Sequence, residues 1–239
     1  MRDDCQTRVV TSLQGLSILV IGASGGLGSA ISGQLQAEGA LLTLQGRDEA
    51  KLAALGSPHV TGDIRDSDTA QRAVDAAIAA YGQLDGVVIA SGVVAFGMMS
   101  DLTDEVLADL FAINTIAPIR IVRAALPHLE ASGKDGNNPF VVNLSAVVAE
   151  QPTAGMAAYS ASKAALTAFD TAAGRELRRS GIRLIDARPP HTETGLADRP
   201  LAGAAPRLPQ GLEPSAVTAR IIEAIKQDER DLPSTAFTA

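Results

Sequence analysis

Cysteine, tryptophan and aromatic side chains in general are scarce in this chain. Cys5 is the single cysteine among 239 residues, tryptophan is absent, and aromatic residues make up 3%. One cysteine excludes an internal disulfide framework and a cysteine-based metal cluster. The three histidines (His59, His128 and His191) have no metal-ligand spacing, so we expect no metal site. So few aromatic residues also argue against the stacking platforms that bind single-stranded nucleic acid.

Positive charge and long apolar runs are limited as well. The chain has 20 Lys and Arg against 27 Asp and Glu, which gives a net charge of −7. Because an acidic surface repels phosphate backbones, we expect no nucleic-acid partner. No apolar run reaches the ~18 residues that a membrane span needs, so we expect no membrane segment. The first residues lack the apolar core of a secretory signal, which favours a cytoplasmic protein.

The composition that remains is that of a globular domain, with 46% hydrophobic and 20% charged residues. No long polar linker divides the chain, so we expect a single domain over residues 14–239 after a polar lead-in at 1–13.

Short apolar runs alternate with segments of helical spacing along this domain. The runs predict strands at 17–21, 41–45, 59–64, 86–90, 140–144, 182–187 and 232–237. The segments between them predict helices at 29–38, 68–81, 103–129, 156–180 and 214–227. Strands that are apolar throughout are covered on both faces. The pattern therefore predicts an α/β fold with a doubly wound parallel sheet of about seven strands between two helical layers.

A glycine-rich loop joins the first strand to the first helix. Residues 22–28 read Gly-Ala-Ser-Gly-Gly-Leu-Gly. A chain that turns tightly and approaches a pyrophosphate closely needs glycine at such a place, and the free N–H groups of the helix start then meet the phosphates. The loop predicts a dinucleotide site, and the alternative is an ordinary glycine-rich connection.

The spacing of these glycines, Gly-x-x-x-Gly-x-Gly at 22, 26 and 28, is followed about 130 residues later by Tyr159-x-x-x-Lys163. Over roughly residues 14–237 the chain resembles the short-chain dehydrogenase/reductase family. The resemblance implies a Rossmann-type fold and hydride transfer between a nicotinamide cofactor and an alcohol or carbonyl carbon.

Tyr159 and Lys163 are spaced so that they project from one face of a helix. A nearby ammonium is expected to lower the pKa of the phenol, which could then act as general acid and base. The resemblance gives these roles to Tyr159 and Lys163, and adds that the lysine binds the nicotinamide ribose. Asn114 resembles the family asparagine that bends its helix and holds a water linked to the lysine. The alternative for Tyr159 and Lys163 is an aromatic ring packed on the lysine side chain. The alternative for Asn114 is a polar helix residue that faces solvent.

The catalytic serine of the family lies thirteen residues before the tyrosine, and here that position is Ala146. Ser145 stands one residue earlier. Either the hydroxyl has been lost, or a one-residue bulge re-aims Ser145, which would otherwise face the other side of the strand. Ser145 is the candidate catalytic serine.

The end of the second strand bears on the choice of cofactor. NAD users place an acidic residue there, whereas this chain has Gly46 followed by Arg47. A guanidinium suits a 2′-phosphate, which favours NADP(H) over NAD(H). A shift of one residue in the loop would instead place Asp48 at the ribose, as in an NAD enzyme.

The resemblance implies a larger set of cofactor contacts: Gly22, Ser24, Gly26, Leu27, Gly28, Arg47, Asp63, Ile64, Ala90, Gly92, Tyr159, Lys163, Pro189 and Thr194. The sequence departs from the family pattern at two places: Ile89 and Ala90 replace the usual asparagines, and Pro190 replaces a glycine. Asp63 could instead cap a helix.

The irregular stretch at 189–213 predicts a substrate lid. Leucines within it, together with Phe96, Met98 and Met99, suggest a small-molecule substrate of partly hydrophobic character. The resemblance further implies a homodimer or homotetramer formed through the helices at 103–131 and 156–180.

Two other functions stay open. A cofactor-binding regulator or scaffold with little turnover is one, and Ala146 is the feature that favours it. An epimerase or dehydratase that uses a transient oxidation is the other.

Overall fold

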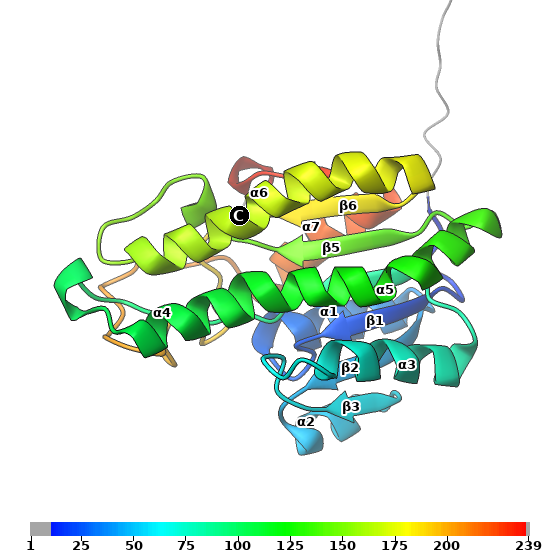
Figure 1. Ribbon diagram of the computed structural model, residues 1–239, viewed down its shortest axis with the longest axis horizontal. Coiled ribbons are helices and arrows are strands. Elements are labelled where there is room, and N and C mark those ends of the chain that lie inside the picture. The colour runs from blue at the N-terminus through cyan, green and yellow to red at the C-terminus, as the bar shows by residue number, and fades with distance from the viewer. Residues whose placement is uncertain (1–10, 238–239) are drawn as a thin grey trace, which may run out of the picture.

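The computed structural model describes residues 11–237, and Cys5 and most of the lead-in lie outside this range. Seven strands form one sheet: β1 (Ser17–Ile21), β2 (Leu41–Gly46), β3 (His59–Thr61), β4 (Gly86–Ile89), β5 (Phe140–Leu144), β6 (Arg183–Ala187) and β7 (Asp231–Leu232). Their order is β3-β2-β1-β4-β5-β6-β7, and every pair is parallel (Figure 1).

Seven α-helices accompany the strands over the described residues: α1 (Gly26–Ala37), α2 (Glu49–Ala54), α3 (Thr69–Tyr81), α4 (Asp104–Phe111), α5 (Ala117–Lys134), α6 (Ala157–Leu177) and α7 (Pro214–Lys226). A π-helical turn, η2 (Ala112–Ile116), joins α4 to α5. Single 3₁₀ turns complete the structure: η1 (Met99–Asp101), η3 (Val147–Ala149), η4 (Arg178–Ser180) and η5 (Ser234–Ala236).

Alternation along β1 shows how the two faces of the sheet are covered. Ile18 and Val20 pack in a core with residues of α1 and α7, while Leu19 and Ile21 pack in a second core with residues of α3 and α5. Helix α6 lies beside α5 on the second face, as Figure 1 shows. Since both faces are buried, the strands are apolar on both sides, and the predicted three-layer fold is confirmed.

The strand order reverses at β1. From there the chain builds outward through β2 and β3 on one side and through β4 to β7 on the other. In sheets of this kind the loops at the carboxyl ends of the two central strands diverge and leave a crevice for a ligand. The glycine loop after β1 and residues 90–98 after β4 border this crevice.

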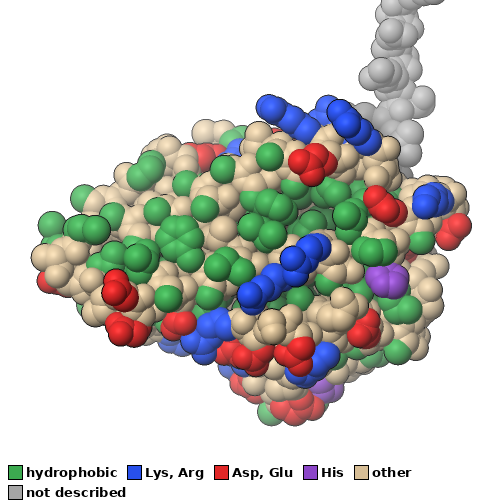
Figure 2. Space-filling view, in the orientation of Figure 1, with side chains coloured by type: hydrophobic (Ala, Val, Ile, Leu, Met, Phe, Trp, Pro, Cys, Tyr) green, Lys and Arg blue, Asp and Glu red, His purple; other side chains and the backbone are tan. Residues whose placement is uncertain are grey.

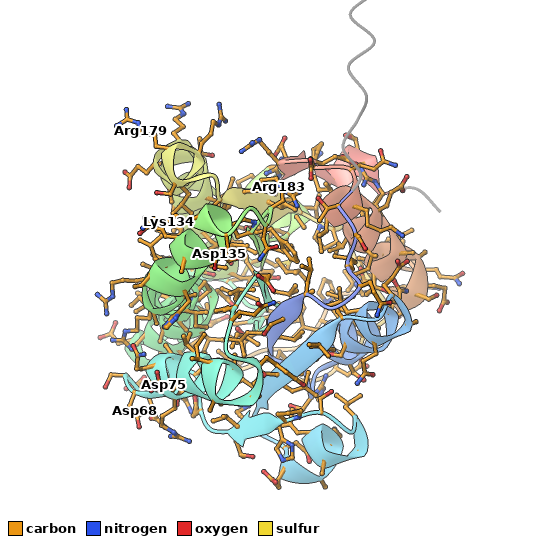
Figure 3. The ribbon with its side chains drawn as sticks, turned by 90° about the vertical axis from the view of Figure 1, so that its right-hand side faces the viewer. Asp68, Asp75, Lys134, Asp135, Arg179 and Arg183 are labelled. Carbon is orange, nitrogen blue, oxygen red and sulfur yellow. The ribbon has the colours of Figure 1, made fainter. Side chains whose placement is uncertain are left out.

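At the opposite end of the sheet, where the strands begin, buried side chains make contacts of their own. Arg183, labelled in Figure 3 where β6 begins, is 2% exposed. Its guanidinium donates to the carbonyl of Ile225 (3.1 Å), pairs with Asp228 (3.2 Å) and lies over the ring of Phe140. These contacts hold the amino-terminal ends of the strands together. The site for chemistry is therefore expected at the carboxyl ends.

The structure corrects several boundaries. The helical stretch expected at 103–129 runs from Asp104 to Lys134 and contains the π turn, with Pro118 just after that turn and Pro127 inside α5. Helix α2 was not expected, because six residues carry too short a periodicity. The last strand covers only Asp231–Leu232. Leu13, assigned to the lead-in, is 1% exposed and belongs to the core.

Two absences concern the described residues. No helix among residues 11–237 is long and apolar enough to cross a bilayer. Within the same range, no group of three or more His, Cys, Asp or Glu side chains is arranged to hold a metal ion.

Candidate active site

The glycine loop forms a cradle that leaves no room for a side chain at Gly22 or Gly28. A Cβ on Gly28 would lie 2.2 Å from the carbonyl oxygen of Gly22, and one on Gly22, whose φ is +78°, would lie 2.7 Å from the amide nitrogen of Ser91. The amides of Gly26, Leu27 and Gly28 open α1 and find no acceptor among the described residues. A close-packed loop with free N–H groups at a helix start fits the pyrophosphate of a dinucleotide.

Two further segments close on this cradle. A Cβ on Gly26 would lie 2.7 Å from the Cβ of Thr194, so the loop after β6 contacts the glycine loop. A Cβ on Gly46 would lie 2.5 Å from the hydroxyl of Ser24, which brings Ser24 to the end of β2. Pro189 is buried, and its carbonyl accepts from the amide of Val147 (3.1 Å). The fold therefore gathers these predicted cofactor residues at one edge of the sheet.

Arg47 and Asp48 have different environments at the end of β2. Arg47 is exposed and makes no hydrogen bond or ion pair with any residue that the structure describes. Asp48 is the N-cap of α2: its carboxylate accepts from the amide of Lys51 (3.1 Å), and this bond lowers its pKa. One side chain is thus free to meet a ligand, and the other is engaged in holding a helix.

Asp63 does not cap a helix. Its carboxylate accepts from the amide of Arg65 (2.9 Å) and forms an ion pair with the Arg65 guanidinium (2.8 Å), which lowers the pKa of Asp63. The next residue, Ile64, is buried in the core under α3. Ala90 continues the sheet after β4, since its amide donates to Ile21 (2.9 Å).

Tyr159 and Lys163 are buried on α6, at 7% and 4% exposure. The Lys163 ammonium donates to the carbonyl of Leu144, at the end of β5 (2.7 Å). Burial raises the pKa of Tyr159 to about 12 and lowers that of Lys163 to about 8. Burial is the cause of the raised Tyr159 pKa, so the lowering by Lys163 that the spacing predicts is not seen in the protein alone.

Asn114 lies in the π turn and is fully buried. Its side-chain oxygen accepts from the amide of Val93 (2.9 Å), and its nitrogen donates to the carbonyl of Val93 (3.0 Å) and to the hydroxyl of Ser162 (3.0 Å). One side chain thus ties the loop after β4 to α6. The extra residue of a π turn re-aims such a side chain, which is why π turns recur at functional sites.

Gly92 marks where these groups meet. A Cβ there would lie 3.4 Å from Nζ of Lys163 and 3.5 Å from Oδ1 of Asn114. Three residues that the resemblance singled out, from separate parts of the chain, therefore surround one point beside the crevice.

The Ser145 hydroxyl faces Thr167 on α6. The register of β5 and β6 runs without a bulge through Leu144, and the amide of Ser145 continues it by donating to Ala187 (2.8 Å). The Ser145 hydroxyl accepts from Thr167 (3.1 Å), which lies roughly two turns beyond Tyr159 on α6. Ala146, by contrast, packs against the apolar cluster that contains Tyr159.

A mainly apolar pocket opens beside Tyr159. Phe96, Met98 and Met99 line it, as the sequence suggests, together with residues of α4 and the start of α6. Asp101, at the rim, is the one charged side chain in this lining. From the predicted lid at 189–213 only Ala202 contributes.

Sequence reasoning missed a group of charged side chains behind Lys163. Asp170 on α6, Asp186 on β6 and Arg188 just after it are all buried. The available signal was a carboxylate within a buried strand, since Asp186 follows Leu184 and Ile185 in Arg183–Ala187.

A dinucleotide cradle at the switch point of the sheet, with a buried Tyr–Lys pair beside an apolar pocket, is suited to passing a hydride and a proton between a cofactor and a substrate. The fold and site together define an oxidoreductase of the Rossmann type.

Comparison with known proteins gives the family. A family model described as short chain dehydrogenase matches residues 17–202. The chain therefore belongs to the short-chain dehydrogenase/reductase family, whose members act on CH–OH groups with NAD(P).

Individual relatives cover most of the chain. An ipsdienol dehydrogenase from Ips pini is 31% identical over 205 residues, which is 80% of each protein. A putative ketoacyl reductase of the monensin polyketide synthase from Streptomyces virginiae is 31% identical over 190 residues, 76% of this chain and 72% of that protein.

Solved structures have the same fold. A short-chain dehydrogenase from Burkholderia cenocepacia J2315 in complex with NADP superposes with a TM-score of 0.81 at 27% identity, covering 95% of this chain and 100% of the other. A 3-ketoacyl-(acyl-carrier-protein) reductase from Brucella melitensis with NADH gives 0.83 at 20% identity, covering 95% and 100%.

Proposed function

We propose that this enzyme is an NADP(H)-dependent oxidoreductase that interconverts an alcohol and a ketone or aldehyde on a small, mainly apolar substrate. The observation that carries the proposal is the position of Tyr159, which lines the apolar pocket and lies one turn from Lys163 on the same buried helix face.

The glycine cradle would hold the cofactor, which would supply the hydride in reduction and accept it in oxidation. Tyr159 gives a proton to the carbonyl oxygen during reduction and takes it back during oxidation. Lys163, held by the carbonyl of Leu144, binds the ribose of the cofactor and stabilises negative charge on the phenolate. Asn114 positions the loop after β4 by its paired bonds to Val93. Packing of the apolar lining around the substrate excludes water.

Preference for NADP(H) over NAD(H) is supported by the end of β2. The guanidinium of Arg47 is exposed and uncommitted among the described residues, and the hydroxyl of Ser24 lies beside Gly46. Both are donors suited to a 2′-phosphate. The carboxylate of Asp48, which a ribose would need in an NAD enzyme, accepts from Lys51 instead.

The substrate class follows from the pocket lining. Apolar side chains dominate it, and the one charged group, Asp101, is negative. A neutral ketone or alcohol of apolar character gains from burial there, whereas an anionic substrate meets a like charge.

Assembly into a homodimer or homotetramer, and a cytoplasmic location, stay predictions. Hydrophobic side chains gather over α4, α5 and α6 in Figure 2. Leu107 on α4 and Ile116 in the π turn are 36% and 43% exposed. We expect light scattering to give twice or four times the chain mass, and Ile116→Asp to shift it toward the monomer.

The proposal is tested by titrating the protein with NADPH and NADH, then following NADPH oxidation with a panel of neutral ketones. Tighter binding of NADPH, with one alcohol formed per NADPH oxidised, is expected. Binding without net reduction of any carbonyl would favour the regulator, for which the specific observation is Ala146 beside Tyr159.

A further inference from the structure

Behind Lys163 lies a cluster of charged side chains that the proposed chemistry does not use. Asp170, Asp186 and Arg188 are 3%, 5% and 8% exposed, and Asn143, which joins them, is fully buried. Buried charges destabilise a protein unless each is paired or neutralised. The two aspartates of this cluster differ in whether they have a cationic partner.

The register of the sheet brings the cluster together. Asn143 on β5 and Asp186 on β6 are direct partners in the sheet, and Asp186 is in turn the partner of Asp231 on β7. Asn143 donates its side-chain amide to the Asp170 carboxyl on α6, at 2.5 Å. A row of polar side chains on one face of the sheet is thus covered by the helix that carries Lys163.

Asp186 has a cationic partner, Arg188. Arg188 donates to Asp186 (2.5 Å), Asp231 (2.6 Å) and Glu150 (2.5 Å) with three different nitrogens. Its charge is therefore shared among three carboxylates, one of which is Asp186.

Asp170 has no such partner. Among residues 11–237 no cation lies within ion-pair distance of it, and Asn143 is its one hydrogen-bond donor. The second oxygen of Asp170, one oxygen of Asp186 and the oxygen of Asn143 are all buried without a donor in the described structure. A proton on Asp170 turns one of these acceptors into a donor and removes the uncompensated charge.

The electrostatics agree with this chemistry. Burial, followed by the negative charge of Asp186, raises the pKa of Asp170 to about 8, although Asn143, Lys163 and Arg188 act in the opposite direction. Lys163 and Asp170 stand seven residues apart, on one face of α6. The charges of Asp186 and Asp170 reach Lys163 and support its ammonium form against desolvation.

We propose that Asp170 is a positioning residue for Lys163: it holds a proton within the Asn143–Asp170–Asp186 cluster and, by releasing it, adds a negative charge behind the lysine that keeps the ammonium protonated. The effect on turnover rests on the proposed function of Lys163, whereas the proton itself does not.

The coupling has a definite sign. Below the pH at which Asp170 ionises, the cluster holds one proton on Asp170 and Lys163 is charged. As the pH rises, loss of the Asp170 proton strengthens the field that favours the Lys163 ammonium, so that the lysine stays charged to a higher pH. Removing the Asp170 carboxyl removes this support.

Asp170→Asn is the informative variant, because the amide reproduces the protonated carboxyl. Its oxygen can accept from Asn143 and its NH₂ group supplies the missing donor, so the fold is kept. Asp75→Asn is the matched control, since Asp75 is exposed on the outer side of α3 (Figure 3).

Two measurements need no substrate. Infrared spectra of the full chain should show the carbonyl band of a buried protonated carboxyl near pH 6, fading around pH 8, absent in Asp170→Asn and unchanged in Asp75→Asn. The chain has four lysines, Lys51, Lys134, Lys163 and Lys226. Carbon-13 NMR of labelled lysine should therefore resolve Lys163, assigned by Lys163→Met, with its titration moved to lower pH in Asp170→Asn.

Enzyme kinetics supply the third measurement. The alkaline limb of the kcat/KM profile for ketone reduction should move to lower pH by about one unit in Asp170→Asn, in step with the lysine signal. Absence of the infrared band in the native chain overturns the proton on Asp170. A band with an unmoved Lys163 titration overturns the coupling. Failure to reduce any ketone removes the proposed function but leaves both spectroscopic results to decide the cluster.

Discussion

Ser145 and Ala146 are neighbours in the chain that face opposite sides of the strand extension beyond β5. The hydroxyl of Ser145 accepts from Thr167 (3.1 Å), while the methyl group of Ala146 packs against the cluster that holds Tyr159. A hydroxyl at position 146, in place of this methyl group, would lie on the side of Tyr159.

Ala146→Ser should raise turnover. The new hydroxyl adds a positioned donor on the Tyr159 side, and loss of one such donor costs about 2.7–4 kcal/mol in a well-studied site. We expect kcat to increase by at least about tenfold, with Ser145→Ala as the control that leaves kcat within about threefold. Steady-state kinetics check both. A large loss of kcat in Ser145→Ala would show that Ser145 acts as the catalytic serine after all.

Tyr159→Phe should abolish the proton transfer and spare the cofactor site. General acid–base catalysis contributes about 10²- to 10⁴-fold, and we expect kcat to fall by that range while the Kd for NADPH stays the same. Tyr81→Phe is the control, because that hydroxyl only donates to the carbonyl of Leu42 (3.1 Å). Unchanged turnover in Tyr159→Phe would remove Tyr159 from the mechanism.

Arg47→Ala should weaken NADPH binding selectively. A charge-assisted hydrogen bond contributes about 1.5–3 kcal/mol, so the Kd for NADPH should rise by about 10- to 100-fold. NADH has no 2′-phosphate and serves as the internal control, with no change in its Kd. An equal rise in Kd for both nucleotides, or tighter binding of NADH by the native protein, would contradict the role of Arg47 and would favour Asp48 as the residue that contacts the ribose.

Asp101→Asn should relax discrimination against anionic substrates. Asp101 is exposed at the pocket rim, where a single charge contributes at most about 1 kcal/mol. The kcat/KM for a keto acid should rise by about two- to fivefold at low ionic strength, and that for a neutral ketone of the same size should not change. An equal rise for both substrates would argue that Asp101 acts on pocket shape and not through charge.

Lys163 should make the stability of the protein depend on alkaline pH. Its folded pKa of about 8 lies below its ordinary value of 10.5, so between these values the unfolded chain binds more protons. The free energy of unfolding then rises with pH, by at most about 1.4 kcal/mol per unit. Urea unfolding at pH 8 and pH 10 should show this rise in the native chain and not in Lys163→Met. Lys51→Met, at an exposed site, should behave as the native chain does.

Local pattern was enough for the fold and for the chemistry-bearing motifs. Apolar runs predicted the strands because both faces of a parallel sheet are buried, and the glycines at 22, 26 and 28 predicted a cradle whose backbone leaves no room for a Cβ. The spacing of Tyr159 and Lys163 predicted a shared helix face, which α6 provides. These features depend on residues close together in the chain, and the sequence displays them directly.

What only the tertiary structure decided depends on contacts between distant segments. The bonds of Asn114 to Val93 and Ser162, the turn of Ser145 toward Thr167, and the meeting of Asn143, Asp170 and Asp186 all join separate elements. The pKa of Tyr159 belongs to the same group, because desolvation is a property of everything packed around a residue and not of its neighbours in sequence. Spacing along the chain fixed which residues could act, and burial and sheet register fixed what they face.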